Sequence, residues 1–204
     1  LFLIGTANFY NFMDGINGIA GLSGVIAFGL MGAYTLYYAP VYGYRESMSL
    51  LAICIALACL GYLPFNMPRA KVFMGDVGSI LLGFVFAALV VMLARNYQDM
   101  VCFAALLFPF YADELTTMAV RLQDHESLVQ SHRRHLYQLL ANEAGMAHWK
   151  VTLIYGAIQL AIGGGVLFLN GYGVRPVVLF LTACFIIFSL ASLFIRNEIK
   201  KKQS

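Results

Sequence analysis

Three short polar stretches interrupt a sequence that is otherwise apolar. They read NFMDGING at residues 11–18, NMPRAKVFMGDVGS at 66–79 and HRRHLYQ at 132–138. Magnesium in proteins takes one or two carboxylates together with phosphate oxygens and water, and the N-terminus of a helix offers free N–H groups to an anion. Closely spaced Arg and His side chains bind phosphate through charged hydrogen bonds. Together these groups could bind a phosphate compound with a divalent cation.

The two acidic stretches also have a simpler interpretation. Asp76 or Ser79 could merely cap the helix that is predicted to follow, and Asp14 could cap the next one. Asn8 and Asn11 precede Asp14 at spacings of three, so the three side chains share one face if the first helix continues through them. Polar groups inside a membrane helix are costly without partners, which favours a functional site.

The basic stretch has two alternatives. His132 and His135 lie one helical turn apart with Arg133 and Arg134 between them, which suits phosphate. A zinc site would need further ligands, and no Cys or acid stands at a suitable spacing. A basic segment beside a membrane could instead contact anionic lipid.

Composition places the chain in a membrane. Of 204 residues, 61% are hydrophobic and 11% charged, with a mean hydropathy of +0.77, whereas a soluble domain has about 25% charged residues. The net charge of +3 is too small to indicate nucleic acid. The four cysteines lie in apolar runs without CxxC spacing, so we expect small buried side chains rather than disulfides or metal ligands.

Six apolar runs are long enough to cross a bilayer, at about 20 residues each. They cover residues 18–38, 47–65, 78–96, 100–119, 150–169 and 176–195. The first dozen residues span only about 18 Å at 1.5 Å per residue. We therefore predict an all-α polytopic integral membrane protein, with six transmembrane helices and a truncated N-terminal helix. Residues 1–204 form one membrane domain with a long loop at 120–149, and we expect it to be the C-terminal part of a longer protein.

Charge predicts the orientation. If the side of Asp14 is inside, the inner connections and the tail hold ten of the thirteen Lys and Arg residues, and the outer ones hold Arg45, Arg95 and Arg175. This bias is typical of a cytoplasmic side. All three polar stretches then face the cytoplasm, whereas a transporter would place polar groups near the midplane. Asp99 is predicted to be a solvated residue of an outer loop.

The order NxxNxxDGxNG, FMGDxGS and HxxH resembles the polyprenyl-phosphate N-acetylhexosamine-1-phosphate transferases, over about residues 8–138. HRRHLYQ is similar to the branch that begins O-antigen and enterobacterial common antigen synthesis, since peptidoglycan enzymes have adjacent histidines there. The family transfers a sugar 1-phosphate from a UDP-N-acetylhexosamine to polyprenyl phosphate, releases UMP and needs Mg²⁺ (or Mn²⁺). The resemblance implies a bacterial inner-membrane enzyme with its site on the cytoplasmic side, and a homodimer is among the expected assemblies.

The resemblance also implies roles for individual residues. Asp76, with Asp14, is expected to hold the metal. Phe73 corresponds to the ring that stacks on uracil, and Asn66 to a polar partner of the nucleotide. The remaining expected substrate-binding residues are Asn8, Asn11, Asn17, Arg133 and Arg134, with His132 and His135 as catalytic groups.

The sequence departs from the family's pattern at Asn17 and in its lack of an adjacent aspartate pair. Asn17 stands where the peptidoglycan branch has Asp, and Asp113 matches a polar family position to which no role follows. The family's adjacent aspartate pair is absent from these 204 residues, so we expect it upstream.

CDP-alcohol phosphotransferases also begin their signature with DG, but the Ala-Arg and the further acids that they need do not follow. The alternative function is a non-catalytic transporter or scaffold.

Overall fold

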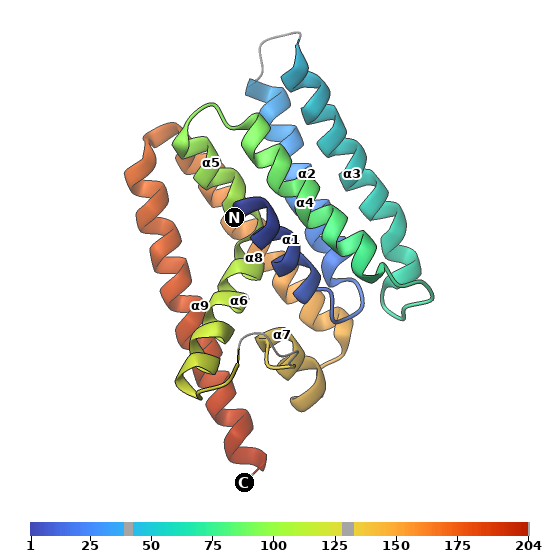
Figure 1. Cartoon of the computed structure of the whole chain (residues 1–204), viewed down its shortest axis with the longest axis vertical. Coiled ribbons are helices and arrows are strands. Elements are labelled where there is room, and N and C mark those ends of the chain that lie inside the picture. The colour runs from blue at the N-terminus through green and yellow to red at the C-terminus, as the bar shows by residue number, and fades with distance from the viewer. Residues whose placement is uncertain (39–42, 128–132, 204) are drawn as a thin grey trace.

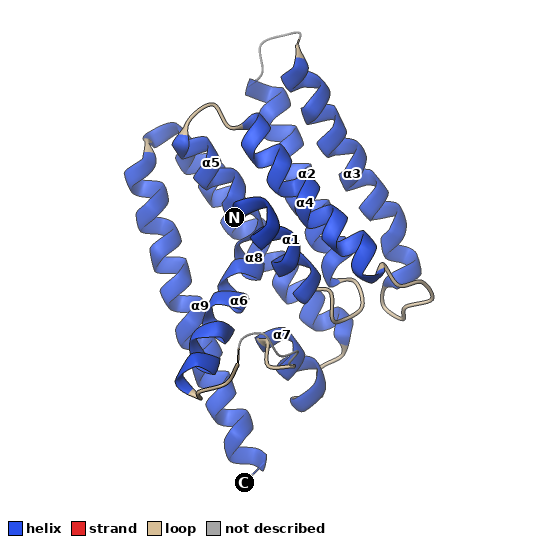
Figure 2. Ribbon diagram, viewed as in Figure 1, coloured by secondary structure: helices blue, strands red, loops and turns tan. Residues whose placement is uncertain are grey.

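The computed structural model describes residues 1–38, 43–127 and 133–203, and the described chain is helical with no strand (Figures 1 and 2). The helices are α1 (Phe2–Phe12), α2 (Ile19–Tyr38), α3 (Tyr44–Asn66), α4 (Gly75–Leu93), α5 (Tyr97–Ala104), η1 (Ala105–Leu107), α6 (Phe108–Gln123), α7 (Leu136–Gln138), η2 (Leu139–Glu143), α8 (His148–Leu169), η3 (Asn170–Tyr172) and α9 (Val174–Gln203).

Six of these helical segments are long and apolar enough to cross a membrane, as predicted. The fourth, over residues 97–123, is not a single regular helix, because a 3₁₀ turn at Ala105–Leu107 separates α5 from α6. Pro109 follows at the start of α6. Since proline has no N–H and its ring crowds the preceding turn, it fits best in the first turn of a helix. The break lets one span follow two directions.

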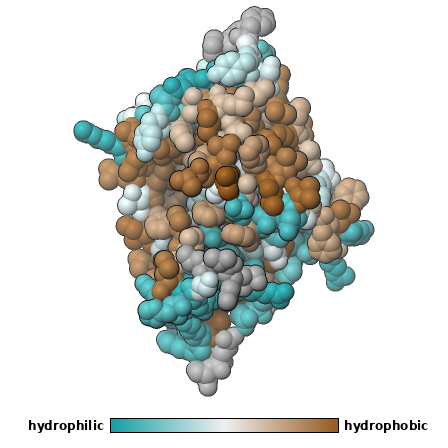
Figure 3. Space-filling model, in the orientation of Figure 1, coloured by the Kyte–Doolittle hydropathy of each residue, from teal (hydrophilic) through white to brown (hydrophobic). Residues whose placement is uncertain are grey.

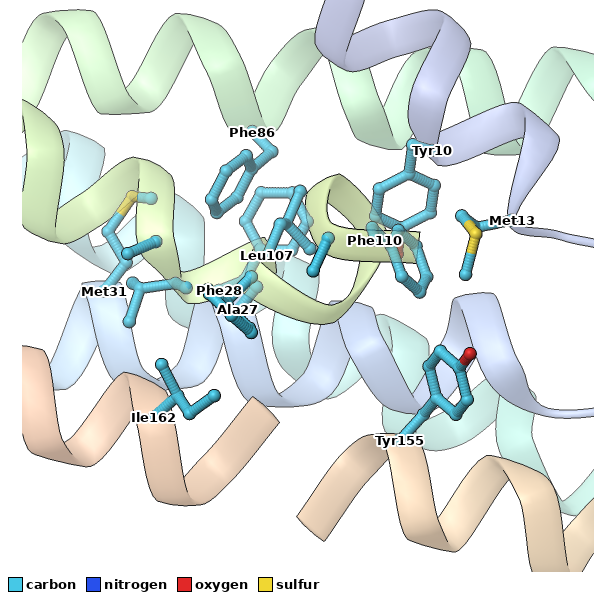
Figure 4. Close-up of a cluster of buried hydrophobic side chains, with 14 of the residues drawn as sticks. Tyr10, Met13, Ala27, Phe28, Met31, Phe86, Leu107, Phe110, Tyr155 and Ile162 are labelled. Atoms are coloured by element: carbon cyan, nitrogen blue, oxygen red, sulfur yellow. The ribbon is translucent and has the colours of Figure 1, made fainter. Parts of the chain in front are cut away.

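Small residues bring the helices close together. A Cβ atom on Gly83 of α4 would lie 2.8 Å from the Cα of Ala7 in α1, and one on Gly24 of α2 would lie 2.7 Å from the Cys59 sulfur in α3. Such close approach is how membrane helices pack without a hydrophobic driving force. Figure 4 shows the resulting core, in which side chains from α1, α2, α4, α6 and α8 meet, with Tyr10 edge-on to Phe110.

The polar connections gather at one end of the bundle. Figure 1 shows the α1–α2 and α3–α4 connections, α7 and the C-terminus at one end, and the α4–α5 and α8–α9 connections at the opposite end. The visible face in Figure 3 carries an apolar belt with hydrophilic residues gathered below it. This arrangement puts the three polar stretches on the same side, as the charge distribution predicted; which compartment that side faces stays a prediction.

Some local expectations were wrong. Asp99 is buried rather than solvated, because its carboxylate accepts hydrogen bonds from the Arg95 and Asn170 side chains. The 120–149 segment is partly helical: α6 continues to Gln123, and α7 with η2 forms a short packed turn. All four cysteines are free, and Cys59 and Cys102 are buried as expected, but Cys54 is exposed and Cys184 is only partly buried.

Topology can be measured by cysteine labelling in a version without native cysteines. Ser127→Cys should react with a membrane-impermeant thiol reagent only from the cytoplasmic side. Gly171→Cys, where an added side chain meets nothing within 4 Å, should react only from outside. The reason is the excess of Lys and Arg at the Ser127 end. Labelling of Ser127→Cys from outside would contradict the orientation.

Candidate active site

A cavity of about 190 Å³ lies at the polar end, between the α1–α2 connection and the segment that leads into α4. Its lining brings together five of the predicted site residues from three separate parts of the sequence. The lining residues are Asp14, Gly15, Ile16, Asn17, Asn66, Phe73, Met74, Gly75 and Asp76.

Two carboxylates share this cavity without partners. Among the described residues, the side chains of Asp14 and Asp76 make no hydrogen bond or ion pair. Burial, and secondly the negative charge of Asp76, raise the pKa of Asp14 to about 7. The charge of Asp76 disfavours a charge on Asp14, and a cation between the two carboxylates would reverse that effect.

The donor set fits magnesium and does not form a complete protein cage. Within the described ranges, no group of three or more His, Cys, Asp or Glu side chains is arranged to hold a metal. Magnesium uses one or two carboxylates and takes its other ligands from phosphate and water. Asp14 and Asp76 therefore suit a metal that arrives with a phosphate compound.

The capping interpretation of the second stretch does not hold. Met74 is the N-cap of α4, and no side chain caps that helix end. Asp76 lies in the first turn, beside free backbone N–H groups. The Ser79 hydroxyl instead lies 2.5 Å from the Asn11 amide oxygen, which ties α4 to α1. The start of α4 thus remains open to an anion.

Asn66 links the two walls of the cavity. Its amide oxygen accepts a hydrogen bond from the Gly18 N–H at 2.5 Å, and its amide nitrogen donates to the Val72 carbonyl at 2.8 Å. The side chain is only 5% exposed. Asn66 therefore positions both connections, which is a role that the sequence did not suggest. Phe73, in contrast to the buried Asn66, has 76% of its surface exposed at the cavity edge.

The α1–α2 connection is held by groups from far along the sequence. Thr152 donates to the Asn17 carbonyl at 2.8 Å, the Asn17 N–H lies 3.4 Å from Nδ1 of His148, and Tyr137 donates to the Phe12 carbonyl at 2.9 Å. These supporting residues were missed from the sequence. No local pattern marks them, because each contact joins residues more than a hundred positions apart.

The other predicted site residues do not line this cavity. Asn8 is exposed on α1, and α1 ends at Phe12, so the predicted stripe through Asn8 and Asp14 is not one helical face. Arg133 and Arg134 line a different cavity, of about 390 Å³, together with residues of α6, η2 and α9. Arg134 is paired there with Asp124, at 2.5 Å, and with Glu126.

Of the two predicted catalytic histidines, the structure describes His135. His135 is buried, with its ring stacked on Tyr137 and its Nε2 3.5 Å from a carboxylate oxygen of Glu114. A phosphate-binding role for His135 stays a prediction that this position does not support. His132 lies outside the described residues.

Comparison with known proteins gives the family. Residues 1–94 match the model described as Glycosyl transferase family 4. The chain is 35% identical over 167 residues to a phospho-N-acetylmuramoyl-pentapeptide-transferase of Staphylococcus saprophyticus, covering 78% of this chain and 49% of that protein. It is 31% identical to the protein of the same name from Staphylococcus aureus strain JH9, covering 78% and 47%. The chain thus spans about half the length of these relatives. The match over residues 1–94, the two similar transferases and the motifs together show that the chain belongs to glycosyl transferase family 4.

Proposed function

We propose that the complete protein transfers a sugar 1-phosphate from a UDP-N-acetylhexosamine to polyprenyl phosphate and releases UMP. The observation that carries this proposal is the cavity in which two unpartnered carboxylates, an exposed aromatic ring and an open helix start meet. The carboxylates match the cation of a metal-bound nucleotide sugar, the aromatic ring matches its base, and the helix start matches its phosphates. The family and the relatives' name support the same class of reaction.

The residues of this chain act mainly by binding and orientation. In phosphoryl transfer the protein does little covalent chemistry, so positioning and charge neutralisation dominate. Asp14 and Asp76 would hold Mg²⁺, which when bound supplies positive charge to the phosphate oxygens. Phe73 offers its face to the uracil ring. The first N–H groups of α4 would donate hydrogen bonds to the diphosphate oxygens, while Asn66 and Ser79 keep the walls in place.

The lipid acceptor approaches from the membrane. Transfer requires an oxygen of the lipid phosphate to attack the β-phosphorus of the donor, and the bond from that phosphorus to UMP breaks. The cavity lies at the end of membrane-spanning helices, where a phosphate head on a polyprenyl tail would also be found. We place this reaction at the cytoplasmic face of the bacterial inner membrane, because the nucleotide sugar is soluble and the basic residues gather there.

The finer identity of the pathway is part of the proposal. The HRRHLYQ spacing and Asn17 favour O-antigen or enterobacterial common antigen synthesis, while the relatives carry the name of a peptidoglycan enzyme. Measuring UMP release with UDP-GlcNAc and with UDP-MurNAc-pentapeptide separates the two. A transporter or scaffold would release no UMP with either donor.

Asp76→Asn should abolish transfer by the complete protein while leaving its expression near that of the wild type. Asparagine has the size of aspartate but lacks the charge that holds the cation, so we expect a loss of at least ~10²-fold in UMP release. Glu198→Gln is the matched control, because Glu198 is a partly exposed acid that does not line the cavity. Activity of Asp76→Asn within a few fold of wild type would reject Asp76 as the metal ligand.

Phe73→Ala should weaken binding of the nucleotide without unfolding the protein, because the ring is mostly exposed. Stacking on a base contributes about 1–3 kcal/mol, so the KM for the UDP-sugar should rise roughly 5- to 100-fold. Phe73→Tyr should retain binding. The control is Phe65→Ala, which removes an exposed ring of α3 that does not line the cavity. An equal KM in Phe73→Ala and wild type would refute the stacking role.

A further inference from the structure

Asp113 is a fully buried carboxylate with four hydrogen-bond donors around it. One oxygen accepts from the Leu136 N–H at 2.8 Å and the Thr117 hydroxyl at 3.1 Å. The other accepts from the Tyr137 N–H at 3.2 Å and the Tyr155 hydroxyl at 2.6 Å. Four donors occupy the lone pairs that two carboxylate oxygens offer. The first turn of α7 is therefore built on this one side chain of α6.

A buried cation completes the group around Asp113. The Arg196 guanidinium of α9 lies 3.7 Å from the Asp113 carboxylate and donates to the Thr117 hydroxyl at 2.7 Å. It also donates to the backbone carbonyl of Arg134 at 2.6 Å, immediately before α7. Arg196 thus balances the buried charge and holds the chain that enters the turn. Asp113 and Arg196 together join α6, α7, α8 and α9.

Tyr137 connects this group to the candidate active site. Its backbone is held by Asp113, and its side chain is fully buried and ends at the α1–α2 connection. The hydroxyl donates to the Phe12 carbonyl at 2.9 Å, two residues before Asp14. A Cβ atom at Gly15 would lie 2.1 Å from the same oxygen. Only glycine leaves room for the phenol at this place.

We propose that Asp113 is a positioning residue for the candidate active site, acting through Tyr137 on the connection that carries Asp14 and Asn17. Asp113 and Arg196 fix the backbone of α7, which places the Tyr137 hydroxyl against the Phe12 carbonyl and Gly15. This sets where the Asp14 carboxylate stands relative to Asp76. The effect on transfer rests on the proposed function, whereas the effect on the connection itself does not.

Tyr137→Phe is the sharpest test, because it removes only the hydroxyl and leaves the buried ring and its backbone bonds. Hydrogen–deuterium exchange of peptides covering residues 13–18 should become roughly two- to tenfold faster, as expected for the loss of one hydrogen bond. Under the proposed function, kcat/KM for UMP release should fall by a similar factor. Asp113→Asn should have a larger effect on both, because it also leaves Arg196 without its buried partner.

Tyr111→Phe is the matched control. It also removes a phenol hydrogen bond to α1, the 2.8 Å contact with the Thr6 hydroxyl, but that contact ends on a helix one turn or more before the connection. Exchange at residues 13–18 should match wild type in this variant. Unchanged exchange in Tyr137→Phe, or equally faster exchange in Tyr111→Phe, would overturn the positioning role.

Gly15→Ala gives a second, independent measurement. The Gly15 backbone is not left-handed, so alanine is disfavoured there only by contact with Tyr137. Gly15→Ala alone should speed hydrogen–deuterium exchange at residues 13–18. When it is combined with Tyr137→Phe, the two effects should be less than additive, because the closest atom to the added methyl group, the Tyr137 hydroxyl oxygen, is then absent. Strict additivity would argue against direct contact. A wild-type protein that releases no UMP would instead reject the proposed function, while exchange would still decide the positioning role.

Discussion

Burying a carboxylate among apolar helices costs several kcal/mol unless its oxygens are occupied and its charge is balanced. At Asp113 both conditions are met, by four donors and by Arg196. Because these groups come from four helices, the helices cannot shift independently without leaving a charge unpaired. A single interaction of this kind orders the polar end of the bundle through directional hydrogen bonds, which add to the close packing at small residues between the helices.

The candidate active site occupies the end of the bundle that this interaction orders. Its two walls are short connections, the second running into the start of α4, and side chains hold them in addition to backbone hydrogen bonds. Asn66 joins one wall to the other, Thr152 fixes Asn17, and Ser79 ties α4 to Asn11. With the walls fixed, Asp14 and Asp76 remain close together and unpartnered. Such a pair is unfavourable for the empty protein and favourable for binding a divalent cation.

The basic stretch shows how one motif can divide into two structural parts. Its arginines line the cavity between α6, η2 and α9, and Arg134 is neutralised there by Asp124 and Glu126. Its second half turns inward: His135 stacks on Tyr137, and the N–H groups of Leu136 and Tyr137 are used by Asp113. Groups that look available for phosphate in the sequence are thus partly committed to holding the fold.

The sequence by itself determined the membrane class, the six spans and the common side of the three polar stretches, because apolar length and charge bias are local properties. It also indicated Asp14 and Asp76, since acids and glycines beside helix starts form recognisable patterns, whereas Asn17 and Phe73 were indicated by the family resemblance. Only the tertiary structure decided that Asn66 joins the two connections that line the cavity, that His135 is buried and that Asp113 supports the site through Tyr137. Those roles depend on contacts between residues that are distant in the sequence: 48 positions separate Asn66 from Gly18, 24 separate Asp113 from Tyr137, and 125 separate Tyr137 from Phe12. Helix packing, which no local pattern encodes, brings such residues together.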